Sequence, residues 1–379
     1  MGSLSLMTWN WQNPSWPIFK WDRSRLSATE EQFLLGAGVV IGAVKHLGED
    51  EHNQLFVEVM SGEALTTSEI EGEILNRDSV QSSIQRQLGL AADKRRITPA
   101  ELGIAEMMVD LYRSFSQPVS SERLFTWHRM LTSGRKDLID IGRFRTSREP
   151  MQVVSGPIGD PRVHFEAPPS KQVPAEMKRF IAWFNRTAPQ GAEPLPAITR
   201  AGIAHLYFES IHPFEDGNGR IGRAIAEKAI AQGFGQPLLV ALATTILAHQ
   251  KSYYEALEKA NRQTDVTEWL TWFADIALEA QRRTIMQVEF LIAKTKLLDR
   301  LRGHINERQQ KALLRMFREG PEGFKGGLSA ANYSTITGAS PATTTRDLAD
   351  LTEKGALVRT GERKHARYAV RDSHRFVNN

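Results

Sequence analysis

Between residues 31 and 301 the chain is a succession of helical patterns, interrupted by one pair of strand-like segments. In the helical patterns apolar residues recur at three- and four-residue spacing, which is typical of amphipathic helices. The predicted helices cover about 31–44, 51–75, 99–116, 122–131, 175–187, 197–209, 221–232, 243–261 and 266–301. This pattern predicts a mainly α body.

The exception is the stretch from Met151 to Ala167, which predicts a β-hairpin. Gln152–Val154 and Val163–Phe165 have strand-forming residues, and a turn from Gly156 to Pro161 separates them. It is the clearest pair of strands in the first 300 residues.

The C-terminal part has a different order of elements. Helices are predicted at 307–318, 329–337 and 341–354, and two strands follow at 356–359 and 366–370. Three helices followed by a basic hairpin are the order of a winged helix-turn-helix. We therefore predict three parts: a helical region to residue 95, a core over 96–300, and a winged helix-turn-helix over 301–379.

The N-terminal region begins with a cluster of tryptophans at positions 9, 11, 16 and 21, with Pro14 and Pro17 between them. So many indole rings in an irregular segment indicate a strap that lies against a neighbouring surface. A small local core is the alternative.

Composition excludes several classes of protein. The chain has no cysteine, which rules out disulfides, cysteine zinc sites and thiol nucleophiles. Its longest uncharged stretch of low polarity, Leu238–Leu247, is about half of what a membrane-spanning helix needs. No basic segment followed by an apolar one opens the chain, so no secretory signal is predicted. We expect a cytoplasmic protein with no membrane partner.

The net charge of +4 is too small to indicate nucleic acid by itself, but the tail is locally basic. From Gly355 onward the basic residues are Arg359, Arg363, Lys364, Arg367, Arg371 and Arg375, against Glu362 and Asp372. If the winged helix binds DNA, Thr343–Arg346 would reach base edges and Arg363 with Lys364 would contact phosphates. Contacts to protein are the alternative role of this part.

The stretch from Ile211 to Arg223 carries most of the chemical information. Gly217, Asn218 and Gly219 lie in a turn just before a predicted helix, where backbone N–H groups and the helix dipole form an anion site. Arg220 and Arg223 add two guanidinium groups suited to phosphate oxygens. Together these residues predict a site for a polyphosphate.

Two side chains beside this loop add chemistry to it. Asp216 is an oxygen ligand next to the predicted anion, and Mg²⁺ typically takes one or two carboxylates together with phosphate oxygens. His212 is a base whose ordinary pKa lies near neutral pH. A dinucleotide-binding fold is excluded because the preceding segment is helical and no acidic residue follows at the required distance.

The stretch resembles the signature of the Fic family, H-x-F-x-D/E-G-N-G-R-x-x-R, and matches it at every fixed position. The resemblance implies that His212 deprotonates a target hydroxyl, which attacks the α-phosphate of ATP, while Phe214 packs inward. It also implies that Asp216 holds Mg²⁺. The residues implied to bind the nucleotide are Asp216, Gly217, Asn218, Gly219, Arg220, Arg223, Tyr254 and Asn261.

Two further segments resemble parts of Fic proteins. The predicted hairpin, with Val153, Val154 and Gly156, is similar to the flap on which the target's backbone docks as an added strand. The stretch from Thr67 to Gly72 resembles the family's inhibitory motif, S/T-x-x-x-E-G/N. The resemblance implies that Glu71 pairs with Arg223 and holds it away from the γ-phosphate.

The sequence therefore predicts a self-inhibited enzyme that transfers AMP from ATP to a protein, and to itself, with residues 96–300 as the Fic core. A homodimer is expected from the family. Two alternatives remain within the same site: transfer of another nucleotide, and removal of AMP from a modified protein. A DNA-binding regulator that acts through the winged helix is an alternative of another class.

Overall fold

The computed structural model describes residues 9–45, 47–93, 95–157, 161–237, 240–320, 323–324 and 326–371. Contacts divide the chain into two compact units. The first comprises Met1–Val39 with Phe56–Arg282, and the second comprises Val40–Leu55 with Arg283–Asn379. The predicted mainly α fold is confirmed, with two small antiparallel hairpins.

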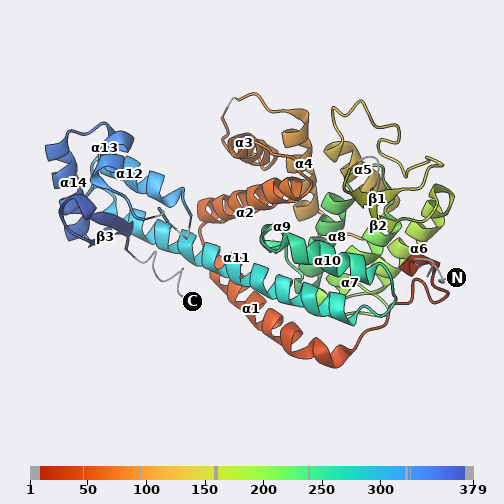
Figure 1. Cartoon of the computed structure of the whole chain (residues 1–379). Coiled ribbons are helices and arrows are strands. Elements are labelled where there is room, and N and C mark those ends of the chain that lie inside the picture. Colours follow the sequence, from red (N-terminus) through yellow and green to blue (C-terminus); the bar gives the residue numbers. More distant parts are fainter. Residues whose placement is uncertain are drawn as a thin grey trace. The chain divides into compact units, whose positions relative to one another are not determined.

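The helices up to residue 301 lie in the first unit, except that α1, α2 and α11 each continue into the second (Figure 1). They are α1 (Ser27–Lys45), α2 (Glu49–Ile70), α3 (Arg77–Gln87), α4 (Pro99–Arg113), α5 (Ser121–Leu131), α6 (Val173–Arg186), α7 (Ala197–Ile211), α8 (Asn218–Phe234), α9 (Leu242–Ala248), α10 (Gln250–Ala260) and α11 (Thr267–Leu301). Every residue of α7 is buried, and so is nearly all of α8. A helix without an exposed face lies in the centre of a core, so these two helices fix the segment that joins them.

Three helix boundaries differ from the sequence prediction. The helix predicted to reach residue 75 ends at Ile70, because Gly72 adopts a left-handed conformation with a φ of 79°. The helix α3 was not predicted, since three serines and only two apolar residues make up its buried face. The helix predicted over 243–261 is two helices separated at His249. After this break Tyr253 is buried, and its hydroxyl lies 2.9 Å from Nε2 of His205.

The predicted hairpin is present as β1 (Gln152–Ser155) and β2 (Arg162–Glu166), paired antiparallel. Every residue of β1 is exposed, whereas Phe165 of β2 is buried. Part of the predicted turn, residues 158–160, lies outside the described residues.

The tryptophan-rich segment has features of both predicted alternatives: it lies as a strap beside α6 and the hairpin in Figure 1, and its Trp9 forms a small buried cluster with Phe165 and Ala167. The ring of Trp9 packs edge-on against Phe165 at 5.4 Å, and the Trp11 indole donates a 2.7 Å hydrogen bond to the backbone oxygen of Glu166. Between them, the buried Asn10 donates from its side chain to Ser210 of α7 at 2.8 Å. The strap therefore joins β2 to the centre of the unit.

The second unit contains α12 (Glu307–Phe317), α13 (Ala330–Thr337), α14 (Pro341–Glu353), β3 (Leu357–Thr360) and β4 (Arg367–Val370). The strands β3 and β4 pair antiparallel, and an isolated bridge joins Leu328 to Tyr368 of β4. The elements thus follow in the order of a winged helix-turn-helix, with a short turn at Gly338 between α13 and α14.

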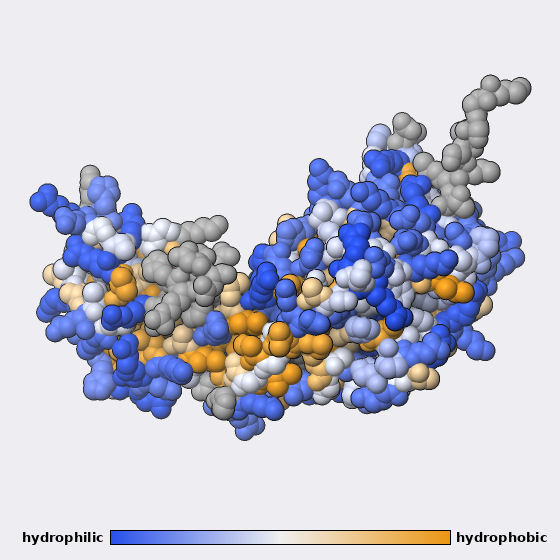
Figure 2. All heavy atoms as spheres, turned by 90° about the horizontal axis from the view of Figure 1, so that it is seen from below, coloured by the Kyte–Doolittle hydropathy of each residue, from blue (hydrophilic) through white to orange (hydrophobic). Residues whose placement is uncertain are grey.

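Apolar side chains also reach the surface. Figure 2 views the face on which α1 lies and shows apolar side chains at this surface. From α1, Leu34, Leu35 and Val39 are exposed. The expected homodimer stays a prediction. Among the described helices, none has both the length and the apolarity needed to cross a bilayer.

Candidate active site

The loop between α7 and α8 is held in shape by its own residues. The helix α7 ends at His212, which adopts a left-handed conformation with a φ of 50°, and Gly217 with a φ of 80° precedes α8. The amide of Asn218 accepts from the backbone N–H of Phe214 at 3.0 Å and donates to its backbone oxygen at 2.9 Å. Phe214 is fully buried and stacks on His128 at 4.3 Å, so its predicted inward packing is confirmed.

The hydrogen bonds between Asn218 and Phe214 affect which groups of the loop can contact a ligand. Both ends of the Asn218 amide are hydrogen-bonded to Phe214 within the loop, and the predicted contact of Asn218 with a phosphate stays a prediction. The first N–H groups of α8 have no partners inside the helix and lie at its positive end. The anion site predicted from the sequence would be formed by the backbone at the start of α8, and it stays a prediction.

His212, the predicted base, lies at the end of α7. Its backbone oxygen accepts a 2.7 Å hydrogen bond from Nε of Arg145, and its Nδ1 lies 3.9 Å from Oε2 of Glu209. Burial, and then the positive charge of Arg145, lower the pKa of His212 to about 4. The imidazole is therefore neutral near pH 7.

Asp216, the predicted metal ligand, lies among arginines. Its Oδ2 accepts from Arg135 at 2.5 Å, and its Oδ1 lies 3.4 Å from Arg220 and accepts from the N–H of Gly217 at 2.6 Å. Burial acts to raise the pKa of Asp216, but Arg220 and Arg135 hold it below its ordinary value. The carboxylate is therefore charged. Arg135, which the sequence analysis missed, also pairs with Asp137.

For a magnesium ion Asp216 offers one charged carboxylate, whose oxygens are contacted by Arg135 and Arg220 in this structure. Within the described part of the chain, no group of three or more His, Asp or Glu side chains is placed to hold a metal. One charged carboxylate next to a phosphate site suits Mg²⁺, which takes its other oxygens from phosphates and water.

The two signature arginines are both paired with the end of α2. Arg223, with a side chain only 2% exposed, donates to Oε1 of Glu71 at 2.7 Å and to the Thr67 hydroxyl at 2.7 Å. The Glu71 carboxylate lies so close to Gly219 that a Cβ there would be 2.1 Å from Oε1. The structure therefore brings together Glu71 and Arg223 as the resemblance implied.

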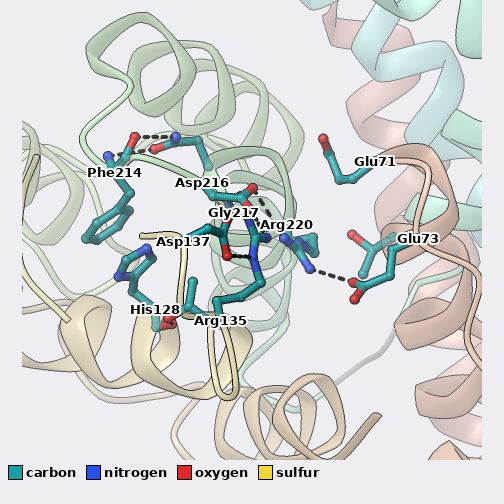
Figure 3. A network of polar contacts seen from close by, with 12 residues as sticks. Glu71, Glu73, His128, Arg135, Asp137, Phe214, Asp216, Gly217 and Arg220 are labelled. Carbon is teal, nitrogen blue, oxygen red and sulfur yellow. Dashed lines mark hydrogen bonds and ion pairs between the residues drawn. The ribbon is translucent and has the colours of Figure 1, made fainter. Parts of the chain in front are cut away.

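A second acidic residue, Glu73, occupies the other arginine. Its Oε2 accepts from Nη1 of Arg220 at 2.8 Å, as Figure 3 shows. Sequence reasoning missed this residue, although its position two residues after Glu71 was visible. Asp216, Arg220 and Glu73 thus form one network with Arg135 and Asp137 (Figure 3).

Tyr254 and Asn261, which are also expected to bind the nucleotide, differ in their surroundings. Tyr254 is exposed, and its hydroxyl donates to the backbone oxygen of Ile70 at 3.4 Å, beside the end of α2. Asn261 is buried, and its side-chain oxygen accepts from Ser210 at 3.0 Å. The structure therefore places Tyr254 on the surface of the site and Asn261 in its support.

The flap presents an open edge beside the site. Val153 and Val154 are exposed, and a bulge lies between them. The other strand is fixed to α10, because His164 and Arg162 contact Glu258 at 2.8 Å and 3.1 Å. The predicted flap residue Gly156 follows β1 with a φ of 96°.

Comparisons with known proteins agree with this geometry. Residues 118–230 match the Fic/DOC family, and residues 9–90 match a domain of unknown function (DUF4172). The protein adenylyltransferase fic-1 of Caenorhabditis elegans is 28% identical over 143 residues, which are 38% of this chain and 24% of that protein. A probable protein adenylyltransferase of Aquifex aeolicus is 27% identical over 25% of this chain and 26% of that protein.

The chain thus matches about a quarter of the length of these curated relatives. Among solved structures, a Fic family protein from Desulfovibrio desulfuricans shares the fold with a TM-score of 0.51. It is 21% identical over 90% of this chain and 95% of that one.

Proposed function

We infer that this chain, whose residues 118–230 form a Fic domain, transfers AMP from ATP to a hydroxyl side chain of a target protein. The observation that carries this proposal is the position of His212. A neutral imidazole lies at the end of α7, next to the start of α8, which carries Arg220 and Arg223. A base beside an anion site is what phosphoryl transfer to a hydroxyl requires.

In the proposed reaction the target hydroxyl gives its proton to Nε2 of His212, and its oxygen forms a bond to the α-phosphorus. The bond between that phosphorus and the bridging oxygen breaks, and pyrophosphate leaves. The N–H groups at the start of α8 and the two signature arginines neutralise charge on the phosphates. When bound, Mg²⁺ supplies further neutralisation, with Asp216 as its ligand. Val153 and Val154 hold the target strand at the open edge of β1.

We further propose that Glu71 inhibits this reaction. Arg223 cannot satisfy its guanidinium fully with both the Glu71 carboxylate and a phosphate. The 2.7 Å contact between them supports this competition.

The proposed reaction is tested by incubating the Glu71→Gly variant separately with ATP, GTP, UTP and CTP, each labelled on the α-phosphate. Label on protein from ATP alone is the expected result. Label from another nucleotide instead would favour the alternative transfer. Release of AMP from a labelled protein by the parent chain would favour the removal reaction. Mass spectrometry of the product identifies the modified Ser, Thr or Tyr.

Transfer should require Mg²⁺, and Asp216→Ala should reduce both the activity and its dependence on the ion. The reason is that Asp216 is a charged carboxylate beside the anion site. Transfer rates are measured over a magnesium titration, and ATP affinity is measured with and without the ion. Asp137→Asn, which changes the other acidic partner of Arg135, is the matched control. Full activity in excess chelator would contradict the assignment.

A second candidate function, DNA binding by the second unit, is favoured by charge. Residues 301–379 hold 14 Lys and Arg against 8 Asp and Glu, a net charge of +6, whereas the other residues sum to −2. Arg346, Arg359 and Arg363 are exposed, and no ion pair is recorded for them among the described residues. Unpaired arginines on one small unit favour contacts with phosphates.

The outward face of α14 fits this role with one correction. Ala342, Thr345 and Arg346 are exposed near its start, where a recognition helix meets base edges. Thr344, which was expected to reach the bases, is buried because it faces the core of the unit. The Thr344 part of the sequence prediction is therefore wrong.

The full chain should bind a duplex of about 30 base pairs at low salt, and lose about fortyfold in affinity between 50 and 200 mM salt if three phosphates are contacted. Gel shifts at the two salt concentrations measure this. Replacing Arg346, Arg359 and Arg363 by alanine should abolish the shift. Arg302→Ala, which removes an exposed arginine paired with Asp299, should not. No shift of the parent at low salt would end this candidate and leave protein contacts as the role.

A further inference from the structure

The end of α2 is a turn that presents two carboxylates. The N–H of Gly72 donates to the oxygen of Glu69 at 2.9 Å, and the N–H of Glu73 donates to the oxygen of Ser68 at 3.0 Å. These two hydrogen bonds define a Schellman turn, whose middle residue must be left-handed. Gly72 meets this need with its φ of 79°, and a Cβ there would contact nothing within 4 Å. The glycine is therefore required by backbone conformation alone.

This turn places Glu71 and Glu73 on either side of Gly72, each against one signature arginine. Glu71 meets Arg223 at 2.7 Å and Glu73 meets Arg220 at 2.8 Å. The two arginines lie three residues apart, so they are neighbours on one face of α8. Figure 3 shows Glu71 and Glu73 together on the α2 side of the network.

Both arginines need a counter-charge, because their side chains are only 7% and 2% exposed for Arg220 and Arg223. Nε of Arg220 is also buried with no hydrogen-bond partner among the described residues, so its guanidinium has donor capacity left. In this structure Glu71 supplies an acceptor for Arg223, and Glu73 and Asp216 supply acceptors for Arg220. The oxygens of a triphosphate are acceptors of the same kind. To bind both guanidinium groups, the triphosphate has to displace both glutamate carboxylates.

We propose that Glu73 is a second inhibitory residue, which withholds Arg220 from the nucleotide as Glu71 withholds Arg223. The proposal rests on the proposed function, since it concerns the same nucleotide site. Inhibition then has two separate points of contact, and removal of Glu71 releases only one of them.

The test measures ATP affinity directly, by calorimetry in the presence of Mg²⁺, so that it does not depend on transfer. Glu73→Gln removes the charge with little change in size. In the Glu71→Gly background it should tighten ATP binding by about three- to tenfold, a range reduced by the partial exposure of Glu73. Self-modification from ATP should rise by a similar factor.

The matched control is Glu69→Gln, which makes the same change at an exposed position of the same helix. It should alter neither quantity. If Glu73→Gln in the Glu71→Gly background leaves the ATP affinity at the level of the control, the contact between Glu73 and Arg220 is not inhibitory. This holds whether or not the Glu71→Gly variant transfers AMP. If affinity rises as expected but no variant transfers AMP, the proposed function fails and the inference about Glu73 stands.

Discussion

Replacing His212 by alanine should lower AMP transfer by about 10²–10⁴-fold, the range expected for the loss of a general base. The affinity for ATP should change little, because the imidazole acts on the target hydroxyl and the phosphates are bound by α8 and its arginines. Transfer is measured as label incorporated from ATP in the Glu71→Gly background, and affinity by calorimetry. A variant that keeps more than about a tenth of the parent rate would sink the assignment of the base.

The same residue predicts the pH profile of transfer. A base must be unprotonated, and burial together with Arg145 lowers the pKa of His212 to about 4. The acidic limb of kcat/KM should therefore fall near pH 4 rather than near the ordinary histidine value, provided that the fold persists. Burial, and then the charge of Glu71, raise the pKa of Glu209 to about 8, and its carboxylate lies 3.9 Å from the imidazole. Glu209→Gln is therefore the control for a change of rate on the alkaline side of the profile.

Glu71→Gly should raise transfer by about ten- to a hundredfold. A hydrogen bond to a charged group contributes about 1.5–3 kcal/mol, and each 1.4 kcal/mol is about a factor of ten. Because the Arg223 side chain is almost fully buried, its contact with Glu71 should contribute at least as much free energy as the strongest contacts between exposed charges. Without the carboxylate, the γ-phosphate takes its place and the α-phosphate settles in line with the target hydroxyl.

Several controls separate this explanation from others. The gain should vanish in the double variant with His212→Ala, because the base is still required. Arg223→Ala should not reproduce it, because that change also removes the contact with the phosphate. Glu69→Gln removes a charge at an exposed position of the same helix without loosening its last turn, and should have no effect on transfer. If Glu71→Gly is no more active than the parent, self-inhibition by Glu71 is dropped while the catalytic proposal remains.

The sequence by itself determined the local parts of the site. His212, Asp216 and the glycines around Asn218 lie within one short loop, where neighbouring residues fix the conformation through turns and helix ends. The same is true of the hairpin and of the order of elements after residue 301, because both depend on patterns of a few residues. The sequence did not indicate that the Asn218 amide also closes the loop around Phe214.

Only the tertiary structure decided which charges meet. Glu73 and Arg220 are 147 residues apart in sequence, and Arg135 and Asp216 are 81 apart, so no local pattern relates them. They meet because α2 and the segment after α5 pack beside α8, and packing of buried helix faces selects neighbours without regard to sequence distance. From the sequence alone, a charged residue could pair with many others. When the fold buries it, a group of opposite charge has to lie beside it.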